Sequence, residues 1–313
     1  GYLNDDSNLE RVIKPAVNGN TVVSTLDVNV QNAVEKRIQE WMTETGSDHV
    51  GVVVMNPNNG EILAMAGESP FDLNNPREVS SRYTDAEIRQ LGVKEAVGDY
   101  KRKHRNTDQA TITEDQVPAH YTEEEIRSLG LQVAWNQEWR NFCVSDTYEP
   151  GSPAKPMTVA AGLEEGVIGL EETIECTGEY TEVSPAIKCW IYPGRHGPLN
   201  VVGGIANSCN YFVAEVAHRL STNKDTLIYS TDMGIGKLRE YASMFGLNRP
   251  SGIEIPESMP EMTTEDPERS AMGQGTNSYS NVQLSRYVAA IANRGTVFDL
   301  SLLDKMTDSE GNL

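Results

Sequence analysis

The sequence predicts an α/β (α+β) protein, and three segments carry this prediction. Asp27 stands before apolar residues at helical spacing that end at Gly46, as in an amphipathic helix with a polar N-cap and a C-terminal glycine. Two short apolar runs, 50–56 and 61–66, are separated by a Pro-Asn-Asn-Gly turn, which is typical of a β-hairpin. Helical spacing of apolar residues returns in 211–220.

Length and charge limit the class of protein. The 313 residues, 38% of them hydrophobic, are enough for one large domain or two small ones with a buried core. The formal net charge of −20 argues against nucleic acid or an anionic membrane surface as the main partner. No apolar run of about 18 residues occurs, and no signal-like segment follows Gly1, so we expect the printed chain to be soluble.

Residues 74–141 contain a duplicated element. The segment 83–92 recurs as 121–130, and each copy has a Thr-x-x-Glu capping box and a closing glycine. Each copy therefore predicts a short helix. The second copy leads through Trp135 and Trp139 into the segment that begins at Val144, so we expect 74–141 to form one wall above any site in that segment.

A serine and a lysine three positions apart, Ser152 and Lys155, lie in the run Glu-Pro-Gly-Ser-Pro-Ala-Lys-Pro. The prolines at 153 and 156 favour the first turn of a helix, which places both side chains on one face. A serine hydroxyl is a weak nucleophile that a nearby amine activates by taking its proton. Because about one Ser-x-x-Lys is expected by chance at this length, and 221–224 is a second match, the surrounding sequence has to identify the functional one.

The tripeptide Ser208-Cys209-Asn210 opens the helical segment 211–220. With the Ser-x-x-Lys at Ser152 it resembles the first two motifs of the penicillin-recognising serine acyltransferases. Further segments resemble the class B penicillin-binding proteins, and these are 25–35, 56–66, 144–152, 156–166, 271–275 and 283–284. The chain is identified as a member of that family from about Val22 to the last residue. The resemblance implies a penicillin-binding/β-lactamase-like transpeptidase fold, with an antiparallel sheet flanked by helices.

The resemblance also implies a mechanism and partners. Ser152 would attack the penultimate D-alanine carbonyl of a peptidoglycan stem peptide and form an acyl-enzyme, with neutral Lys155 as the base. Ser208 would relay the proton to the leaving amine, Asn210 would bind the substrate amide, and the Ser152 backbone N–H would belong to the oxyanion hole. An amine of a second stem peptide would complete the cross-link. β-Lactams would acylate Ser152, a glycosyltransferase is the expected partner, and no cofactor or metal is implied.

The resemblance divides the chain into two parts. Residues 1–24 are expected to be the tail of an upstream, non-catalytic pedestal-type domain, and residues 25–313 the transpeptidase domain, with the insert at about 74–141. Members of the family act at the extracytoplasmic face of the bacterial membrane, held by an N-terminal helix. We therefore expect the same location here, with the anchor absent from the printed chain.

The family's third motif, Lys-Thr-Gly on a central strand, does not follow Asn210 in the printed sequence. Arg294-Gly295-Thr296 looks similar, but the resemblance places it in a turn after a helix. We expect the printed chain to lack the later strands, part of the oxyanion hole and the carboxylate anchor, and hence to be weak or inactive. The hairpin at 50–66 would then expose an apolar face and edge, which favours aggregation.

Two other functions fit parts of this pattern. A catalytically incomplete or non-catalytic scaffold or sensor of the same fold is favoured by the missing third motif, but it gives no reason to retain Ser152, Lys155, Ser208 and Asn210 together. A class A β-lactamase would need a glutamate in a loop after Ser-x-Asn, and the region around 245–248 has no Glu-x-x-Leu-Asn.

The four cysteines, Cys143, Cys176, Cys189 and Cys209, include no Cys-x-x-Cys pair, and the five histidines are scattered. This pattern argues against a zinc site. Cys176 and Cys189 flank a loop rich in Gly, Pro and Thr, and they form either a disulfide or two free thiols, since sequence cannot test the geometry. Cys209 occupies the variable position of Ser-x-Asn and is expected to be a bystander.

Overall fold

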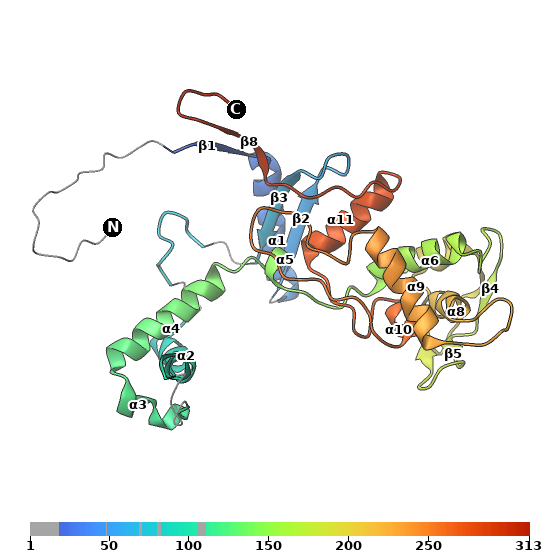
Figure 1. The fold of residues 1–313 in the computed structure, drawn as a ribbon, viewed down its shortest axis with the longest axis horizontal. Coiled ribbons are helices and arrows are strands. Elements are labelled where there is room, and N and C mark those ends of the chain that lie inside the picture. The colour runs from blue at the N-terminus through green and yellow to red at the C-terminus, as the bar shows by residue number, and fades with distance from the viewer. Residues whose placement is uncertain (1–18, 48, 69–70, 80–82, 105–110) are drawn as a thin grey trace, which may run out of the picture.

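The computed structural model describes residues 19–47, 49–68, 71–79, 83–104 and 111–313 (Figure 1). Its elements in chain order are β1 Thr21–Ser24, α1 Val28–Thr45, β2 Gly51–Met55, β3 Ile62–Gly67, α2 Asp85–Lys103, η1 Glu114–Gln116, α3 Val117–His120, α4 Glu123–Glu138, α5 Phe142–Ser145, η2 Ser152–Ala154, α6 Lys155–Glu164, β4 Ile174–Cys176, β5 Glu179–Tyr180, β6 Ile187–Lys188, β7 Gly197–Leu199, α7 Val201–Ala206, α8 Asn210–Leu220, α9 Thr231–Met244, α10 Pro267–Ser270, α11 Asn281–Ala292 and β8 Leu303–Thr307. No helix within these ranges is both long and apolar enough to cross a bilayer.

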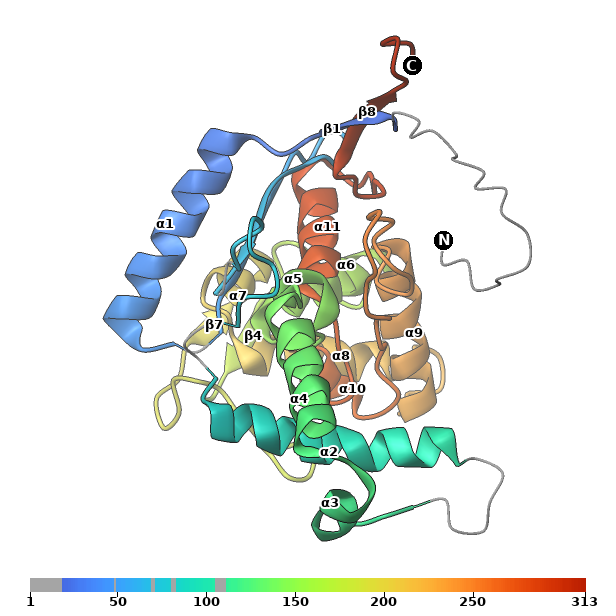
Figure 2. The same ribbon diagram turned by 90° about the vertical axis from the view of Figure 1, so that its left-hand side faces the viewer.

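The predicted helix 27–46 and the predicted hairpin 50–66 are confirmed. The Asp27 carboxylate accepts from the first backbone N–H groups of α1, and Gly46 ends the helix in the left-handed conformation at φ 68°. β2 and β3 pair antiparallel (Figure 1). Helix α1 runs along the left edge of the molecule in the view of Figure 2. The side-chain amide of Gln31 pairs with the backbone of Met65 through a 3.0 Å and a 2.9 Å hydrogen bond, so α1 covers the outer edge of β3.

The strands of the described residues form four separate antiparallel pairs, which are β1–β8, β2–β3, β4–β7 and β5–β6. The predicted α/β class is confirmed, with helices packed around small antiparallel sheets. β1 pairs with β8, which brings residues 21–24 against residues 303–307. Residues 1–18 lie outside the described part, so the predicted boundary at residues 24 and 25 stays a prediction.

The hairpin leaves a groove of about 560 Å³ between β2 and α11. Its lining is mainly apolar and includes Val53, Leu284 and Val288, and Val288 is half exposed. This agrees with the expected open apolar face of the hairpin. The main core lies elsewhere, around α8, whose residues Phe212, Val213 and Val216 are fully buried among α6, α9 and the short strands.

The duplicated segments form helices α2 and α4, and both capping boxes are present, at Thr84 and at Thr122. The predicted stops at Gly92 and Gly130 are wrong, because both helices continue past these glycines. The glycines mark a helix crossing instead. A Cβ on Gly92 would lie less than 3.0 Å from the Ile126 carbonyl, and a Cβ on Gly130 equally close to the Ile88 carbonyl.

The α2–α4 crossing is nearly symmetric, because each copy contacts the other in the same way. Arg89 pairs with Glu123 and Arg127 pairs with Asp85, each at 2.7 Å. The two helices lie at the lower left of Figure 1, on the opposite side of the molecule from α6 and α8. The expectation that the insert forms a wall above the serine site is therefore wrong for its described residues.

Candidate active site

The nucleophile turn is held by a close backbone contact. Gly151 adopts φ 62° before Ser152, and its N–H donates to the Gly273 carbonyl at 2.9 Å. A Cβ on Gly273 would lie less than 3.0 Å from three backbone atoms of Gly151, so only glycine fits there. This contact places the segment 271–275, whose sequence resembles the class B family, against the turn that carries Ser152, and no pattern in the sequence indicates that contact.

The side chains of Tyr287 and Thr158 hold the first turn of α6 in place by hydrogen bonds. The Tyr287 hydroxyl accepts from the Met157 N–H and donates to the Pro153 carbonyl, each at 3.0 Å. The Thr158 hydroxyl donates to the Ala271 carbonyl at 2.8 Å. Tyr287 and Thr158 are fully buried, so the turn that carries Ser152 is tied to the core at several points.

Ser208 and Asn210 come from the junction between α7 and α8. Ser208 has φ 48°, a left-handed conformation that costs a non-glycine residue about 1–3 kcal/mol and recurs at functional sites. The Asn210 side-chain amide donates to the Lys188 carbonyl at 3.2 Å, which ties the junction to strand β6. This strained loop points the Ser208 hydroxyl at Ser152.

A continuous chain of hydrogen bonds joins the four predicted residues. Lys155 Nζ donates to Ser208 Oγ at 2.9 Å, to the Ser208 carbonyl at 2.7 Å and to Asn210 Oδ1 at 2.7 Å. Ser208 Oγ lies 2.9 Å from Ser152 Oγ. Within the described residues the lysine therefore reaches the exposed Ser152 hydroxyl through Ser208.

Burial lowers the pKa of Lys155, whose side chain is 2% exposed, because removal from water disfavours the ammonium form. Negative charge on the sulfurs of Cys189 and Cys209 acts in the opposite direction and raises the pKa of Lys155. A lowered lysine pKa increases the neutral amine that can accept a proton near neutral pH. The arrangement can therefore take a proton from Ser152 along the Ser208 hydroxyl.

The Ser152 backbone N–H is available for an oxyanion. Among the hydrogen bonds of the described residues none uses this N–H, and it stands at the start of the η2–α6 segment. A donor at that position faces developing negative charge. The geometry agrees with the predicted oxyanion donor, whose role stays a proposal.

The two sequence lookalikes are structural. In the second Ser-x-x-Lys match, the Ser221 hydroxyl donates to the Ala217 carbonyl and Lys224 donates to the Glu165 carbonyl, so the two side chains have separate partners. Arg294 and Gly295 have φ 71° and 108° in the turn after α11. The prediction that Arg294-Gly295-Thr296 is a turn after a helix is confirmed.

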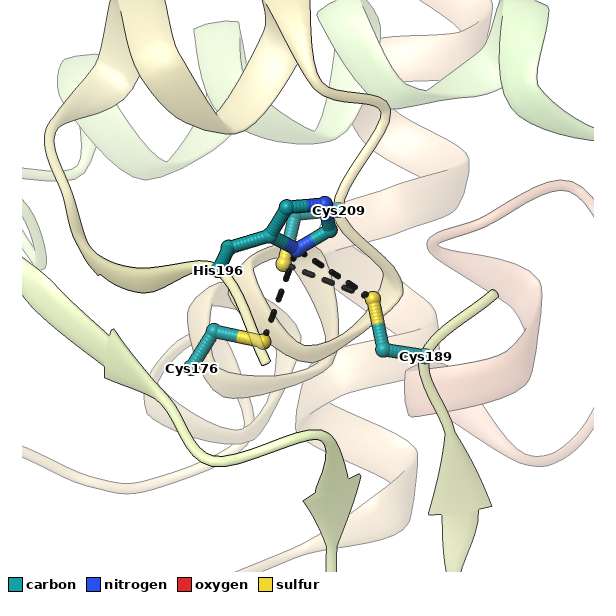
Figure 3. A group of neighbouring side chains, drawn as sticks. All are labelled: Cys176, Cys189, His196 and Cys209. Atoms are coloured by element: carbon teal, nitrogen blue, oxygen red, sulfur yellow. Dashed lines mark hydrogen bonds between the residues drawn. The ribbon is translucent and has the colours of Figure 1, made fainter. Parts of the chain in front are cut away.

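The cysteine predictions need correction. Cys176 and Cys189 are free thiols in the structure, so the disulfide alternative is not the one observed. His196 lies between them, and Cys209 completes a group whose four ligand atoms are within 4.8 Å of one another (Figure 3). The histidines are scattered along the sequence, but the chain folds back between β6 and β7 and brings His196 to the cysteines, so the expectation that no histidine joins them is wrong for His196.

The sequence matches a known family. A sequence model described as "Penicillin binding protein transpeptidase domain" matches residues 50–312, and the chain belongs to this family. Stage V sporulation protein D of Bacillus subtilis is 26% identical over 91% of this chain and 34% of its own length. Penicillin-binding protein 2B of Streptococcus pneumoniae is 24% identical over 94% of this chain and 37% of its own length.

Solved structures show the same fold. Penicillin binding protein 3 of Mycobacterium tuberculosis, complexed with ampicillin, superposes with a TM-score of 0.65 at 20% identity, over 96% of this chain and 53% of that one. A chain of a peptidoglycan synthase complex superposes with a TM-score of 0.64 at 23% identity, over 92% of this chain and 44% of that one. The chain spans about a third of the length of the two curated relatives.

Proposed function

We propose that this chain is the catalytic domain of a class B penicillin-binding protein, a serine D,D-transpeptidase that cross-links peptidoglycan stem peptides and is acylated by β-lactams. The observation that carries the proposal is the hydrogen-bonded chain from the buried Lys155 through Ser208 to the exposed Ser152. A buried lysine with a lowered pKa next to two serines is the arrangement that activates a hydroxyl nucleophile.

The proposed acylation follows this chain of atoms. Neutral Lys155 accepts the Ser208 proton while Ser208 accepts the Ser152 proton, and Ser152 Oγ attacks the penultimate D-alanine carbonyl. The Ser152 N–H stabilises the oxyanion. When the C–N bond breaks, the proton returns through Ser208 to the leaving D-alanine, and Asn210 holds the substrate amide. The amine of a second stem peptide then attacks the ester and regenerates Ser152.

A β-lactam enters the same steps with one difference. Ring opening breaks the amide C–N bond but leaves the amine attached to the acyl group, so no leaving group departs and the ester persists. The proposal also places the domain outside the cytoplasm on a membrane-anchored protein, with a glycosyltransferase as partner. Support for this comes from the family and from the fold shared with a chain of a peptidoglycan synthase complex.

Intact-protein mass spectrometry with benzylpenicillin tests the proposal. One penicilloyl group per chain, mapped to Ser152 and absent from Ser152→Ala, is the expected result. Peptide mapping distinguishes this from an adduct on Ser221, which would contradict the assignment. Absence of an adduct on folded protein that also carries the Lys-Thr-Gly motif would favour the non-catalytic scaffold or sensor of the same fold, whereas absence on the printed sequence alone would agree with the missing third motif.

A further inference from the structure

Three cysteines and a histidine converge beside the serine site (Figure 3). Cys176 ends β4, Cys189 follows β6, His196 precedes β7, and Cys209 is the N-cap of α8. The His196 Nδ1 atom lies 3.6 Å from the sulfur of Cys176 and 3.6 Å from that of Cys189. The sulfurs of Cys189 and Cys209 are 3.8 Å apart, and all three cysteines are buried.

These separations match a tetrahedral metal centre. Zn–S bonds of about 2.3 Å and a Zn–N bond of about 2.0 Å place two sulfur ligands roughly 3.8 Å apart, and sulfur and nitrogen roughly 3.5 Å apart. A disulfide would need sulfurs about 2.05 Å apart. The observed distances of 3.8 Å and 3.6 Å therefore fit shared coordination of one ion between the four side chains.

We propose that Cys176, Cys189, His196 and Cys209 form a structural zinc site. Soft thiolates with one imidazole favour Zn²⁺ over Mg²⁺ or Ca²⁺, which prefer oxygen ligands. Four protein ligands complete a tetrahedral shell and leave no open position for a substrate or a catalytic water. On binding, each of the three thiols releases its proton to solvent, and neutral His196 donates the lone pair of Nδ1.

The site is built into the loop that carries the second motif. Cys209 stands between Ser208 and Asn210 in the chain, so a metal bond to its sulfur restrains both neighbours. On the Cys189 side, the Lys188 carbonyl accepts from the Asn210 amide at 3.2 Å, and the Trp190 ring N–H donates to the Asn207 carbonyl at 2.9 Å. The metal would thus bind two segments that already contact the motif from both sides.

A metal bond at Cys209 would restrain the strained backbone of Ser208. Ser208 is held at φ 48°, and a loop free to relax would move its hydroxyl away from Ser152. The zinc site would keep the strained conformation in place, so its four ligands are positioning residues rather than catalytic ones. This positioning role rests on the proposed function, whereas metal binding itself does not.

Metal analysis tests the site directly. The full chain is purified without chelator from zinc-supplemented medium, and zinc is measured by plasma mass spectrometry. The expected content is about one zinc per chain, and zinc X-ray absorption should show three sulfur ligands and one nitrogen ligand. Replacement with Co²⁺ should give the strong visible bands of a tetrahedral thiolate site. A zinc content below about a tenth per chain in folded protein, or a Cys176–Cys189 disulfide in protein purified without air, would overturn the proposal.

Variants separate a metal ligand from an ordinary buried thiol. Cys189→Ser should lose at least about tenfold of the bound zinc, whereas Cys143→Ser, which changes a buried cysteine outside the cluster, should keep it. Cys176→His can still bind zinc but cannot form a disulfide, so it should retain more zinc than Cys176→Ser. Equal zinc in both Cys176 variants would contradict the assignment even if Cys189→Ser failed to fold.

The positioning role is tested by acylation. Removal of zinc by a chelator should slow benzylpenicillin acylation of Ser152 by about tenfold or more, and added Zn²⁺ should restore the rate. Ser152→Ala should keep its zinc and lose acylation. If wild-type chain binds zinc but is never acylated, the proposed function fails and the metal site stands. If acylation proceeds at full rate without zinc, the positioning role is wrong.

Discussion

The hydroxyl oxygens of Ser152 and Ser208 lie 2.9 Å apart, although 56 positions separate the two residues in the chain. Ser208 also accepts from Lys155 at 2.9 Å, so the second-motif serine stands between the buried base and the exposed nucleophile. A proton moving between Ser152 and Lys155 in this geometry passes through Ser208. Removal of the Ser208 hydroxyl therefore interrupts the path without touching either end.

Ser208→Ala and Ser208→Gly are expected to slow β-lactam acylation by about 10²- to 10⁴-fold, because both remove the relaying hydroxyl. Glycine also removes the left-handed strain at φ 48°, so Ser208→Gly should be the more stable of the two variants. Stopped-flow acylation and thermal unfolding measure the two effects. A rate for Ser208→Gly close to that of the unmodified chain would show that the hydroxyl has no part in proton transfer.

The acylation rate should rise with pH through the pKa of Lys155. Burial disfavours the ammonium, so the folded pKa lies below the ordinary 10.5, and the neutral base is populated at lower pH than for a free lysine. The same shift means that the folded chain binds fewer protons than the unfolded one between these pKa values, so stability should also rise with pH there. Acylation rates with a fluorescent penicillin across the pH range give the midpoint. A midpoint at or above 10.5 would contradict the assigned base.

Gly273→Ala should displace the nucleophile turn. The added Cβ would meet the Gly151 backbone, and φ 78° at this position adds strain for any side chain. Gly295→Ala is the matched control, because Gly295 also has positive φ but an added Cβ meets nothing within 4 Å. We expect a lower unfolding temperature in both variants and a loss of acylation of about tenfold or more only in Gly273→Ala. Equal acylation in the two variants would show that the contact does not position Ser152.

Gly92→Ala should separate α2 from α4, because its Cβ would overlap the Ile126 carbonyl. Gly98→Ala on the same helix meets only the flexible end of Arg102 and should be neutral or more stable by up to about 1 kcal/mol. Limited proteolysis of the insert measures whether α2 has separated from α4. Since the insert lies away from α6 and α8, benzylpenicillin acylation of Ser152 should stay the same in both variants. Loss of acylation in Gly92→Ala would restore the interpretation of the insert as a wall of the site.

The sequence determined the parts of this protein that depend on neighbouring residues. Asp27 and Gly46 mark the ends of α1 because a cap bonds to N–H groups within one turn. The Pro-Asn-Asn-Gly turn defines the hairpin, and Ser152 and Lys155 share a face because the helical repeat fixes their spacing. The resemblance to the class B family predicts Ser208 and Asn210 as further site residues, and the fold brings both to Lys155.

Tertiary structure decided what depends on contacts between distant segments. The sequence predicts helix ends at Gly92 and Gly130, because a missing side chain gives the same signal at a C-cap and at a helix crossing. Only the packing of α2 on α4 distinguishes the two. The four residues of the proposed metal site lie at the ends of short strands and at a helix cap, and they are Cys176, Cys189, His196 and Cys209. Their spacing along the chain does not indicate a common site. The four side chains meet because β4, β6 and β7 fold against α8. This packing depends on contacts between distant segments, so a local sequence pattern does not predict it.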